Sequence, residues 1–147
     1  MFKKILLPTD GSELSQNAVT QGVAFAKSVG AGVVGFFSPP DYSALLYSDF
    51  IPPSLMTQDQ FETNAKAAGE KQLAFIERTA NAAGVPYESH CVASAAPWQA
   101  IVEAAKAKNC DLIFMASHGR TGLSALVLGS QAAKVVSHSE IPVLVYR

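Results

Sequence analysis

The chain has 147 residues, of which 49% are hydrophobic and 16% are charged, and its net charge is -1. A typical domain carries about 25% charged residues, so we expect part of this apolar surface to be buried against a partner. High hydrophobicity with almost no net charge excludes a disordered chain. The lack of a basic excess argues against a nucleic-acid binder or an anionic-membrane binder. The length predicts one domain over residues 1–147.

The first residues, MFKKILLPTDGS, become polar at Pro8 and Asp10, which is too early for the apolar core of a signal peptide. No window approaches the roughly 18 apolar residues of a membrane span. Cys91 and Cys110 have no metal-ligand spacing, so we expect two reduced thiols. These observations predict a cytoplasmic protein.

Short runs of Val, Ile, Leu and Phe alternate with longer segments of helical period, which is the pattern of a parallel sheet built from βαβ units. The predicted strands are Lys4–Pro8, Val33–Ser38, Tyr87–Ala93, Leu112–Ala116 and Pro142–Tyr146. The predicted helices are Glu13–Val29, Gln58–Ala83, one that begins at Pro97, and one near Ser130–Ser137. We therefore expect an α/β fold with an open five-stranded parallel sheet and helices on both faces.

Local signals predict where these elements end. Ser12 or Asp10 can cap the first helix, and Gly30 and Asn109 can take the left-handed conformation after a helix. Polar and apolar residues alternate in Tyr87–Ala93, as in an edge strand. The stretch Pro39–Thr57 contains four prolines and no stable period, so we expect a lid or contact segment there.

Ligands of an open parallel sheet bind beyond the carboxyl ends of its strands, where the strand order reverses. The most informative segment there is Ser117–Ser130, because Gly119 and Gly129 leave room for an anion and Ser130 lies where the last helix begins. A helix start offers unpaired N–H groups and a positive dipole end. The pattern indicates a phosphate cradle. The alternative is that the glycines only shape a turn and Ser130 is an ordinary N-cap.

This region resembles the universal stress protein family, whose ATP-binding members show G-x-x-G, nine residues, and then G-S or G-T. The corresponding residues here are Ala116–Gly119, residues 120–128, and Gly129-Ser130. The resemblance extends over the chain, since Pro8–Ser12 resembles the family's segment after the first strand. Ala95–Pro97 resembles its G-x-P turn, and Ile141–Val145 resembles its closing strand.

The resemblance implies a Rossmann-like sheet in the order 3-2-1-4-5 that binds ATP, or ADP or AMP, together with Mg²⁺. The nucleotide-binding residues that it implies are Pro8, Thr9, Asp10, Ser38, Met115, Ala116, Ser117, His118, Gly119, Gly129, Ser130 and Gln131. Gly119, Gly129, Ser130 and the backbone of Gln131 would contact phosphates, and Met115–His118 would line the ribose and phosphate side. Thr9, Asp10 and the backbone of Ser38 would face the adenosine end, where Ser38 can contact the edge of the base. We add Arg120 as a cation that can offset phosphate charge.

Three residues leave alternatives open. Asp10 can hold Mg²⁺ beside the phosphates, or it can cap the first helix in a capping box with Glu13. Ala116 replaces the family's first glycine, which is harmless at a negative φ but costs roughly 1–3 kcal/mol at a positive φ and would then argue against nucleotide binding. Ala95 raises a smaller version of the same question.

Other motifs are weaker. Gly30–Gly35 matches G-x-G-x-x-G, but it follows a helix and enters a strand, whereas a dinucleotide fingerprint follows a strand. No Walker A lysine is present, and His118 has no orienting partner that the sequence identifies, so we expect it to contact the nucleotide. We predict no catalytic residues, and at most a slow ATPase.

We therefore expect a cytoplasmic, nucleotide-dependent stress-response regulator with an unidentified protein partner. The hydrophobic strand Pro142–Tyr146 is predicted to form a homodimer edge, because exposed apolar edges pair with other chains. Ala44–Met56 is a second apolar segment, which we expect to be buried against the dimer partner or the nucleotide cleft. The alternatives are a dimeric interaction module of the same fold without a nucleotide, and a nucleotide-consuming enzyme.

Overall fold

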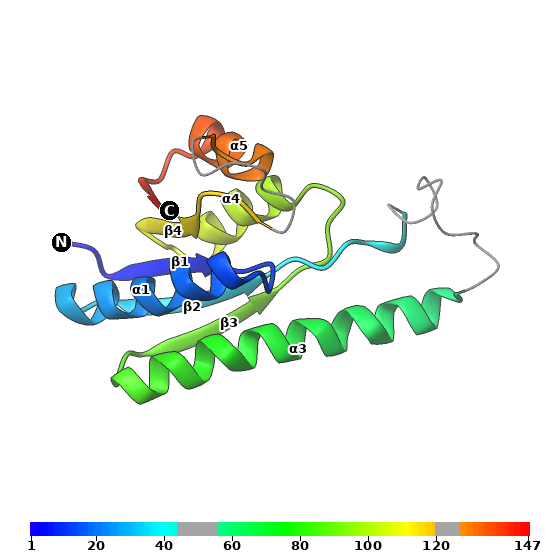
Figure 1. The fold of residues 1–147 in the computed structure, drawn as a ribbon, viewed down its shortest axis with the longest axis horizontal. Coiled ribbons are helices and arrows are strands. Elements are labelled where there is room, and N and C mark those ends of the chain that lie inside the picture. Colours follow the sequence, from blue (N-terminus) through cyan, green and yellow to red (C-terminus); the bar gives the residue numbers. More distant parts are fainter. Residues whose placement is uncertain (44–55, 120–126) are drawn as a thin grey trace.

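The computed structural model describes residues 1–43, 56–119 and 127–147, and these contain a parallel sheet covered by helices (Figure 1). The strand order is β3-β2-β1-β4-β5, as expected. The strands are β1 (Lys4–Pro8), β2 (Gly32–Phe37), β3 (Tyr87–Cys91), β4 (Leu112–Ala116) and β5 (Val143–Tyr146). The order reverses between β1 and β4, so a ligand crevice is expected at their carboxyl ends.

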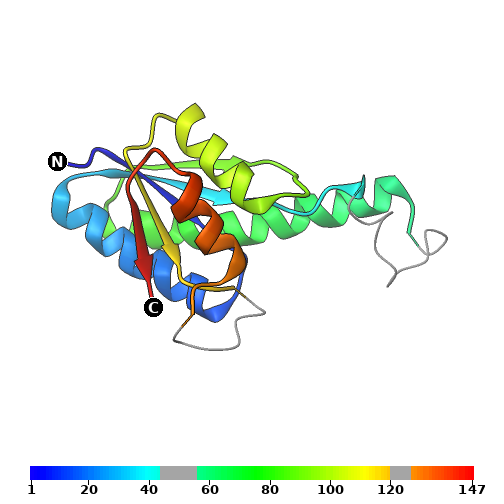
Figure 2. The same cartoon turned by 90° about the horizontal axis from the view of Figure 1, so that it is seen from above.

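The two faces of the sheet have separate hydrophobic cores. The helices α1 (Glu13–Val29) and α3 (Gln58–Ala83) cover one face, and α4 (Pro97–Ala107) and α5 (Ser130–His138) cover the other (Figures 1 and 2). In β1, Ile5 and Leu7 pack toward α1, whereas Leu6 packs toward α4. All three are fully buried, because a central parallel strand is covered on both faces.

The ends of α1 follow from the local sequence. The Ser15 N–H donates to Ser12 Oγ at 3.2 Å, and Gly30 ends the helix with φ of 71°. Asp10 does not cap this helix, because its Oδ1 accepts from the Ser12 N–H at 2.9 Å in the preceding turn. Asn109 takes the left-handed conformation, with φ of 54°, as expected.

The helix α3 is longer than the sheet that it covers. It begins at a capping box in which Thr57 Oγ1 accepts from the Gln60 N–H at 3.2 Å and Gln60 Oε1 accepts from the Thr57 N–H at 3.1 Å. Its buried residues are Gly69, Ile76 and Ala80, so burial begins only near the middle of the helix, and the N-terminal part projects beyond the strands (Figure 1). No helix in the described ranges, α3 included, combines the length and hydrophobicity needed to cross a membrane.

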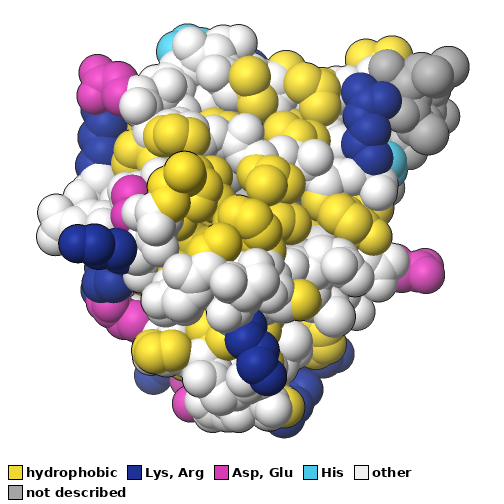
Figure 3. Space-filling view, turned by 90° about the vertical axis from the view of Figure 1, so that its left-hand side faces the viewer, with side chains coloured by type: hydrophobic (Ala, Val, Ile, Leu, Met, Phe, Trp, Pro, Cys, Tyr) yellow, Lys and Arg dark blue, Asp and Glu magenta, His cyan; other side chains and the backbone are white. Residues whose placement is uncertain are grey.

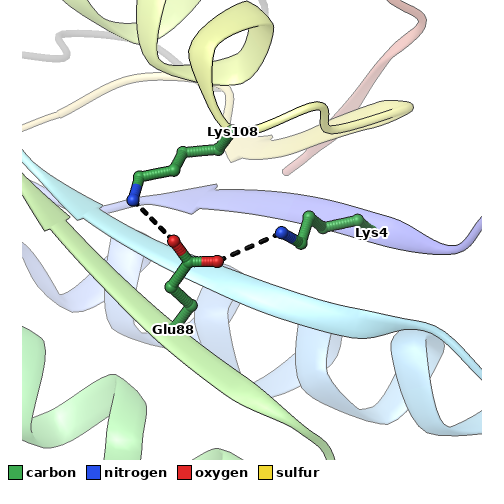
Figure 4. A network of polar contacts seen from close by, with 3 residues as sticks. All are labelled: Lys4, Glu88 and Lys108. Atoms are coloured by element: carbon green, nitrogen blue, oxygen red, sulfur yellow. Dashed lines mark hydrogen bonds and ion pairs between the residues drawn. The ribbon is translucent and has the colours of Figure 1, made fainter.

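Polar groups at the amino end of the sheet are paired with one another (Figure 4). The Glu88 carboxylate accepts from Lys108 Nζ and, at 3.1 Å, from Lys4 Nζ. These two hydrogen bonds, first that of Lys108, lower the pKa of Glu88. The two carboxylate oxygens of Asp111 accept the N–H groups of Lys3 and Lys4 at 2.8 and 3.1 Å.

Aromatic side chains connect this end of the molecule to the core. The ring centroids of Phe2 and Phe25 lie 6.2 Å apart, and those of Phe25 and Phe114 lie 6.0 Å apart. Leu144 and Tyr146 of β5 are half-buried against the same core. Figure 3, which views the molecule from this end, shows hydrophobic side chains gathered in the middle of the face.

Candidate functional site

A cleft of about 1000 Å³ lies at the carboxyl ends of the strands, around the reversal between β1 and β4. All the predicted site residues that the structure describes, except Ser117, line it. They are Pro8, Thr9, Asp10, Ser38, Met115, Ala116, His118, Gly119, Gly129, Ser130 and Gln131. Segments more than 100 residues apart in the sequence are thus brought together by the parallel topology.

Ser117 does not line the cleft. Ser117 is buried, with 4% of its surface exposed, and its N–H donates to the Tyr146 carbonyl at 2.7 Å. Its own carbonyl accepts from the Gly129 N–H at 2.8 Å, so Ser117 links β4, β5 and the start of α5. Arg120 lies outside the described residues.

The hydroxyl group of Thr9 is used within the protein. Ser15 Oγ donates its single proton to the Ser12 carbonyl at 2.9 Å. The 2.9 Å contact between Thr9 Oγ1 and Ser15 Oγ therefore uses the proton of Thr9. Thr9 Oγ1 also accepts from the Gly11 N–H at 3.1 Å. Thr9 lines the cleft but mainly shapes the loop between β1 and α1.

Asp10 lies directly against the loop that follows β4. A Cβ atom on Gly119 would be 2.1 Å from Asp10 Oδ2, so the carboxylate occupies the space that the glycine leaves open. The described ranges contain no group of three or more His, Cys, Asp or Glu that could hold a metal. Asp10 is therefore a single carboxylate ligand, which fits Mg²⁺ only if phosphates and water complete its octahedral shell.

The start of α5 has the geometry of an anion site. Gly129, not Ser130, is the N-cap, so the interpretation of Ser130 as an ordinary N-cap is wrong. The first intrahelical bond runs from the Ala133 N–H to the Gly129 carbonyl at 2.9 Å. The N–H groups of Ser130, Gln131 and Ala132 precede it and have no partner within the helix. They form the positive end of α5 at the cleft.

Position 129 requires a glycine because there is no room for a side chain, and not because of its backbone conformation. Its φ is −58°, which any residue adopts. A Cβ atom would lie 3.0 Å from His118 Cα and 3.3 Å from the Ser117 carbonyl oxygen, so even alanine would displace the neighbouring loop. The glycine therefore brings the start of α5 close to the end of β4.

Gln131 connects α5 with α4. Ala96 has no side chain that can cap α4, and Gln131 Oε1 instead accepts from the Trp98 N–H at 3.0 Å. Trp98 is partly buried against the α4–α5 core, as expected. The carboxamide oxygen of Gln131 is thus used within the protein, whereas its backbone N–H and Nε2 donors remain for a ligand.

The question raised by Ala116 is resolved by its place in β4. Ala116 pairs with Tyr146 of β5 and is 8% exposed. Its φ is not positive, and neither is that of Ala95. Alanine therefore fits at both positions without backbone strain, and neither replacement argues against a ligand in the cleft.

Ser38 contributes an unsatisfied hydroxyl group to the cleft, just beyond the end of β2. Its Oγ atom is buried and has no hydrogen-bond partner in the described part of the chain. Buried polar groups in folded proteins are nearly always hydrogen-bonded, so an unpaired one calls for an explanation. A ligand in the cleft with a polar edge would satisfy it.

α3 also contributes to the cleft, although no residue of this helix was among the predicted site residues. Phe61, Ala65, Ala68 and Gln72 line the cleft, and their spacings of four, three and four place them on one helical face. This periodicity is visible in the sequence. What the sequence does not reveal is that the helix projects past the strands and faces the ligand crevice.

Comparison with known proteins agrees with this architecture. The model of the universal stress protein family matches residues 1–147. Universal stress protein MJ0531 of Methanocaldococcus jannaschii is 31% identical over 148 residues, which cover 100% of this chain and 83% of that protein. A universal stress protein of Thermus aquaticus is 33% identical over 150 residues, which cover 100% of both chains.

Solved structures show the same fold. Hypothetical protein MJ0577, from M. jannaschii, aligns with a TM-score of 0.81 and 27% identity over 99% of this chain and 95% of that chain. A universal stress protein crystallised in complex with cAMP aligns with a TM-score of 0.69 and 24% identity over 99% and 97% of the two chains. This chain therefore belongs to the universal stress protein family.

Proposed function

We propose that this chain, as a single cytoplasmic domain, binds an adenine nucleotide in the cleft and that the bound nucleotide sets its interactions with a regulatory partner. The N-terminus of α5 carries the proposal, because Gly129 holds it against the end of β4 while three of its N–H groups lack helical partners. Helix N-termini of this kind bind phosphate. The unpaired Ser38 hydroxyl provides a second, independent indication of a ligand.

The roles of the lining residues follow from their places. The N–H groups of Ser130 and Gln131, which Gly129 holds close to the end of β4, suit phosphates, and Asp10, which lies against Gly119, suits a phosphate-bound Mg²⁺. Pro8, Met115, Ala116 and His118 form the floor and side of the cleft between phosphate and base. These residues supply shape more than charge, and ATP, ADP or AMP would fit the same arrangement.

Relatives support an adenine nucleotide as the ligand class. One universal stress protein with this fold was crystallised with cAMP and another with dAMP. Adenine is the part that these two ligands share, whereas their phosphate arrangements differ. We propose ATP with Mg²⁺ for this chain, because α5 offers several donors for a chain of phosphates.

We propose at most slow hydrolysis. His118 Nδ1 lies 3.1 Å from Ser117 Oγ, and a hydroxyl group is a weaker orienting partner than a carboxylate. Asp10, the acidic residue of the cleft lining, already accepts the Ser12 N–H. This arrangement suits retention of the nucleotide as a signal better than turnover.

We also propose a homodimer through Pro142–Tyr146. Among the described strands, β5 pairs only with β4, so one of its edges is open for pairing. The Ser117 N–H bonds to the Tyr146 carbonyl, which connects this edge directly to the nucleotide cleft. Analytical ultracentrifugation at micromolar concentration is expected to give a dimer mass, and a monomer mass would contradict the proposal.

Calorimetry with Mg-ATP on wild-type protein and Ser130→Asp tests nucleotide binding. Ser130 is the first residue of α5 and is exposed, so the new carboxylate favours the helix dipole and leaves the fold intact. It also places a negative charge where the phosphates are expected. We predict binding by the wild type and a loss of at least about tenfold in the variant, since 1.4 kcal/mol of repulsion suffices for that factor.

Gln99→Asp is the matched control, because it adds the same charge to the first turn of α4 but lies outside the cleft lining. It is expected to bind Mg-ATP like the wild type. A wild-type protein that neither binds Mg-ATP nor co-purifies with a nucleotide would contradict the proposal. It would favour the interaction module of the same fold.

A further inference from the structure

Gln72 lines the cleft on the side of α3, across the sheet from α5. α3 packs against α1, β2 and β3, whereas α5 packs against α4 and β5 on the other face of the sheet. Gln72 and Ser38, which follows β2, both line the cleft on the α3 side. A nucleotide whose phosphates bind at Ser130 therefore directs its base toward these two residues.

The carboxamide of Gln72 is held in place by the loop between β1 and α1. Gly11 has φ of +80°, and a Cβ atom on it would lie 2.6 Å from Gln72 Nε2 and 3.1 Å from Oε1. Both ends of the amide therefore lie against the glycine, in space that any other residue would fill. Gly11 thus fixes the loop conformation and also makes room for Gln72.

This half-buried amide makes no hydrogen bond to the residues that the structure describes. It can donate through Nε2 and accept through Oε1. A polar group that packing holds at the wall of a cleft, with both functions unused, is pre-organised for a ligand. The Ser38 hydroxyl, buried and unpaired in the same lining, adds a further donor or acceptor.

We propose that Gln72 reads the base of the bound nucleotide and makes the site selective for adenine over guanine. This inference rests on the proposed function. Adenine presents the N6 amino donor beside the N7 acceptor, and a glutamine amide pairs with both. Guanine presents O6 and N7 at the same edge, which are two acceptors, so the Gln72 Oε1 atom would face another acceptor.

Calorimetric titration of Gln72→Met with Mg-ATP and Mg-GTP tests this role. Methionine keeps the length of the side chain but removes both hydrogen-bonding functions. A bidentate pair contributes roughly 5- to 150-fold in discrimination, so we expect the preference of the wild type for ATP to fall by that order. The affinity for GTP is expected to change little.

Two further variants sharpen the experiment. Gln72→Glu replaces the amide donor with a second acceptor, which would face the N7 acceptor of adenine, and it is expected to lower the affinity for ATP. Lys71→Met is the matched control, because Lys71 is the exposed neighbour on α3 and does not line the cleft. It is expected to keep the wild-type preference.

The outcomes separate this inference from the proposed function. If the wild type binds no adenine nucleotide, the proposed function fails. If the wild type prefers ATP and Gln72→Met keeps that preference, the role of Gln72 is wrong while the function stands. An equal loss of ATP and GTP affinity in Gln72→Met would mean that Gln72 only packs against Gly11. It would contradict the proposal that Gln72 selects adenine over guanine.

Discussion

The two ends of the sheet differ in whether their polar groups are hydrogen-bonded within the protein. At the amino end, Glu88 is paired with two lysines and both carboxylate oxygens of Asp111 accept backbone N–H groups. At the carboxyl end, the Ser38 hydroxyl and the Gln72 amide have no hydrogen-bond partner in the described ranges. Pairing within the protein stabilises the fold, whereas unpaired groups at a cleft are available to a ligand. The amino end of the strands therefore contributes to stability, whereas the carboxyl end offers polar groups to a ligand.

The two cysteines give the largest expected difference between the ends. Cys91, at the carboxyl end of β3, is exposed, whereas Cys110, just before β4, is 6% exposed and burial raises the pKa of its thiol to about 11. We expect iodoacetamide at pH 8 to label Cys91 in the native protein. Cys110 should react at least about 10³-fold more slowly, because its exposure requires unfolding.

Peptide mass spectrometry during the reaction measures both rates, and urea-unfolded protein is the control in which both thiols react. Equal rates in native protein would mean that the amino end opens as readily as the cleft end.

Two glycines that both require a positive φ lie at opposite ends of the sheet. Gly11 has φ of +80° and Gly30 has φ of +71°, but a Cβ atom meets Gln72 only at Gly11. Alanine at either position is expected to lower the free energy of unfolding by about 1–2 kcal/mol through backbone strain. Only Gly11→Ala should also alter nucleotide affinity, because it displaces Gln72.

Urea denaturation and calorimetry with Mg-ATP on the two variants separate strain from recognition. A Gly30→Ala variant that lost nucleotide affinity as well would show that strain alone accounts for the effect.

Tyr87, at the amino end of β3, provides a test by pH. Burial, and then the charge of Glu77, raises its pKa to about 12, and its hydroxyl donates to the Leu73 carbonyl at 3.0 Å. A raised folded pKa means that this stabilisation is complete below pH 10.0 and is lost as the pH rises toward about 12. Tyr87→Phe should cost about 1 kcal/mol at pH 7.

The variant should also lose stability less steeply than the wild type between pH 10 and pH 12. Thermal unfolding followed by circular dichroism across this range measures both effects, and parallel pH profiles would contradict the assignment.

Glu88 is expected to give the smallest effect. Its side chain is 41% exposed, so solvent screens the ion pairs with Lys4 and Lys108, and Glu88→Gln should cost about 0.2–1 kcal/mol at pH 7. Because its folded pKa is lowered from 4.5, the contribution exists above that pH and is lost as the pH falls through the folded value. Urea denaturation at pH 7 and pH 3 measures the difference, and 1 M NaCl should reduce it.

Local patterns in the sequence predict the fold well because each one has a local physical cause. Buried parallel strands are apolar throughout, and the bounds of Lys4–Pro8 and Leu112–Ala116 are as predicted. Glycine and asparagine mark helix ends because they tolerate positive φ, as Gly30 and Asn109 do. The start of α5 at Ser130 is as predicted, but the N-cap is Gly129 and not Ser130, and its small size rather than its conformation explains the glycine.

The site was predicted less completely because part of it depends on tertiary structure. Segments that follow strands were found, since topology places them at one edge. Gln72 was missed, because it reaches the cleft only through packing against Gly11, 61 positions earlier in the chain. The internal use of the Thr9 hydroxyl was likewise hidden, because it depends on where Ser15 directs its proton.

The hydrogen bond from the Gly129 N–H to the Ser117 carbonyl has a consequence for the length of the loop between them. It fixes both ends of the connection formed by residues 118–128, and Ser117 is itself tied to the last strand. Closing a longer loop costs only about 0.6 kcal/mol for each doubling of its length. The length of the connection can therefore change between fixed ends while the start of α5 keeps its place, provided that the cleft residues His118 and Gly119 are kept.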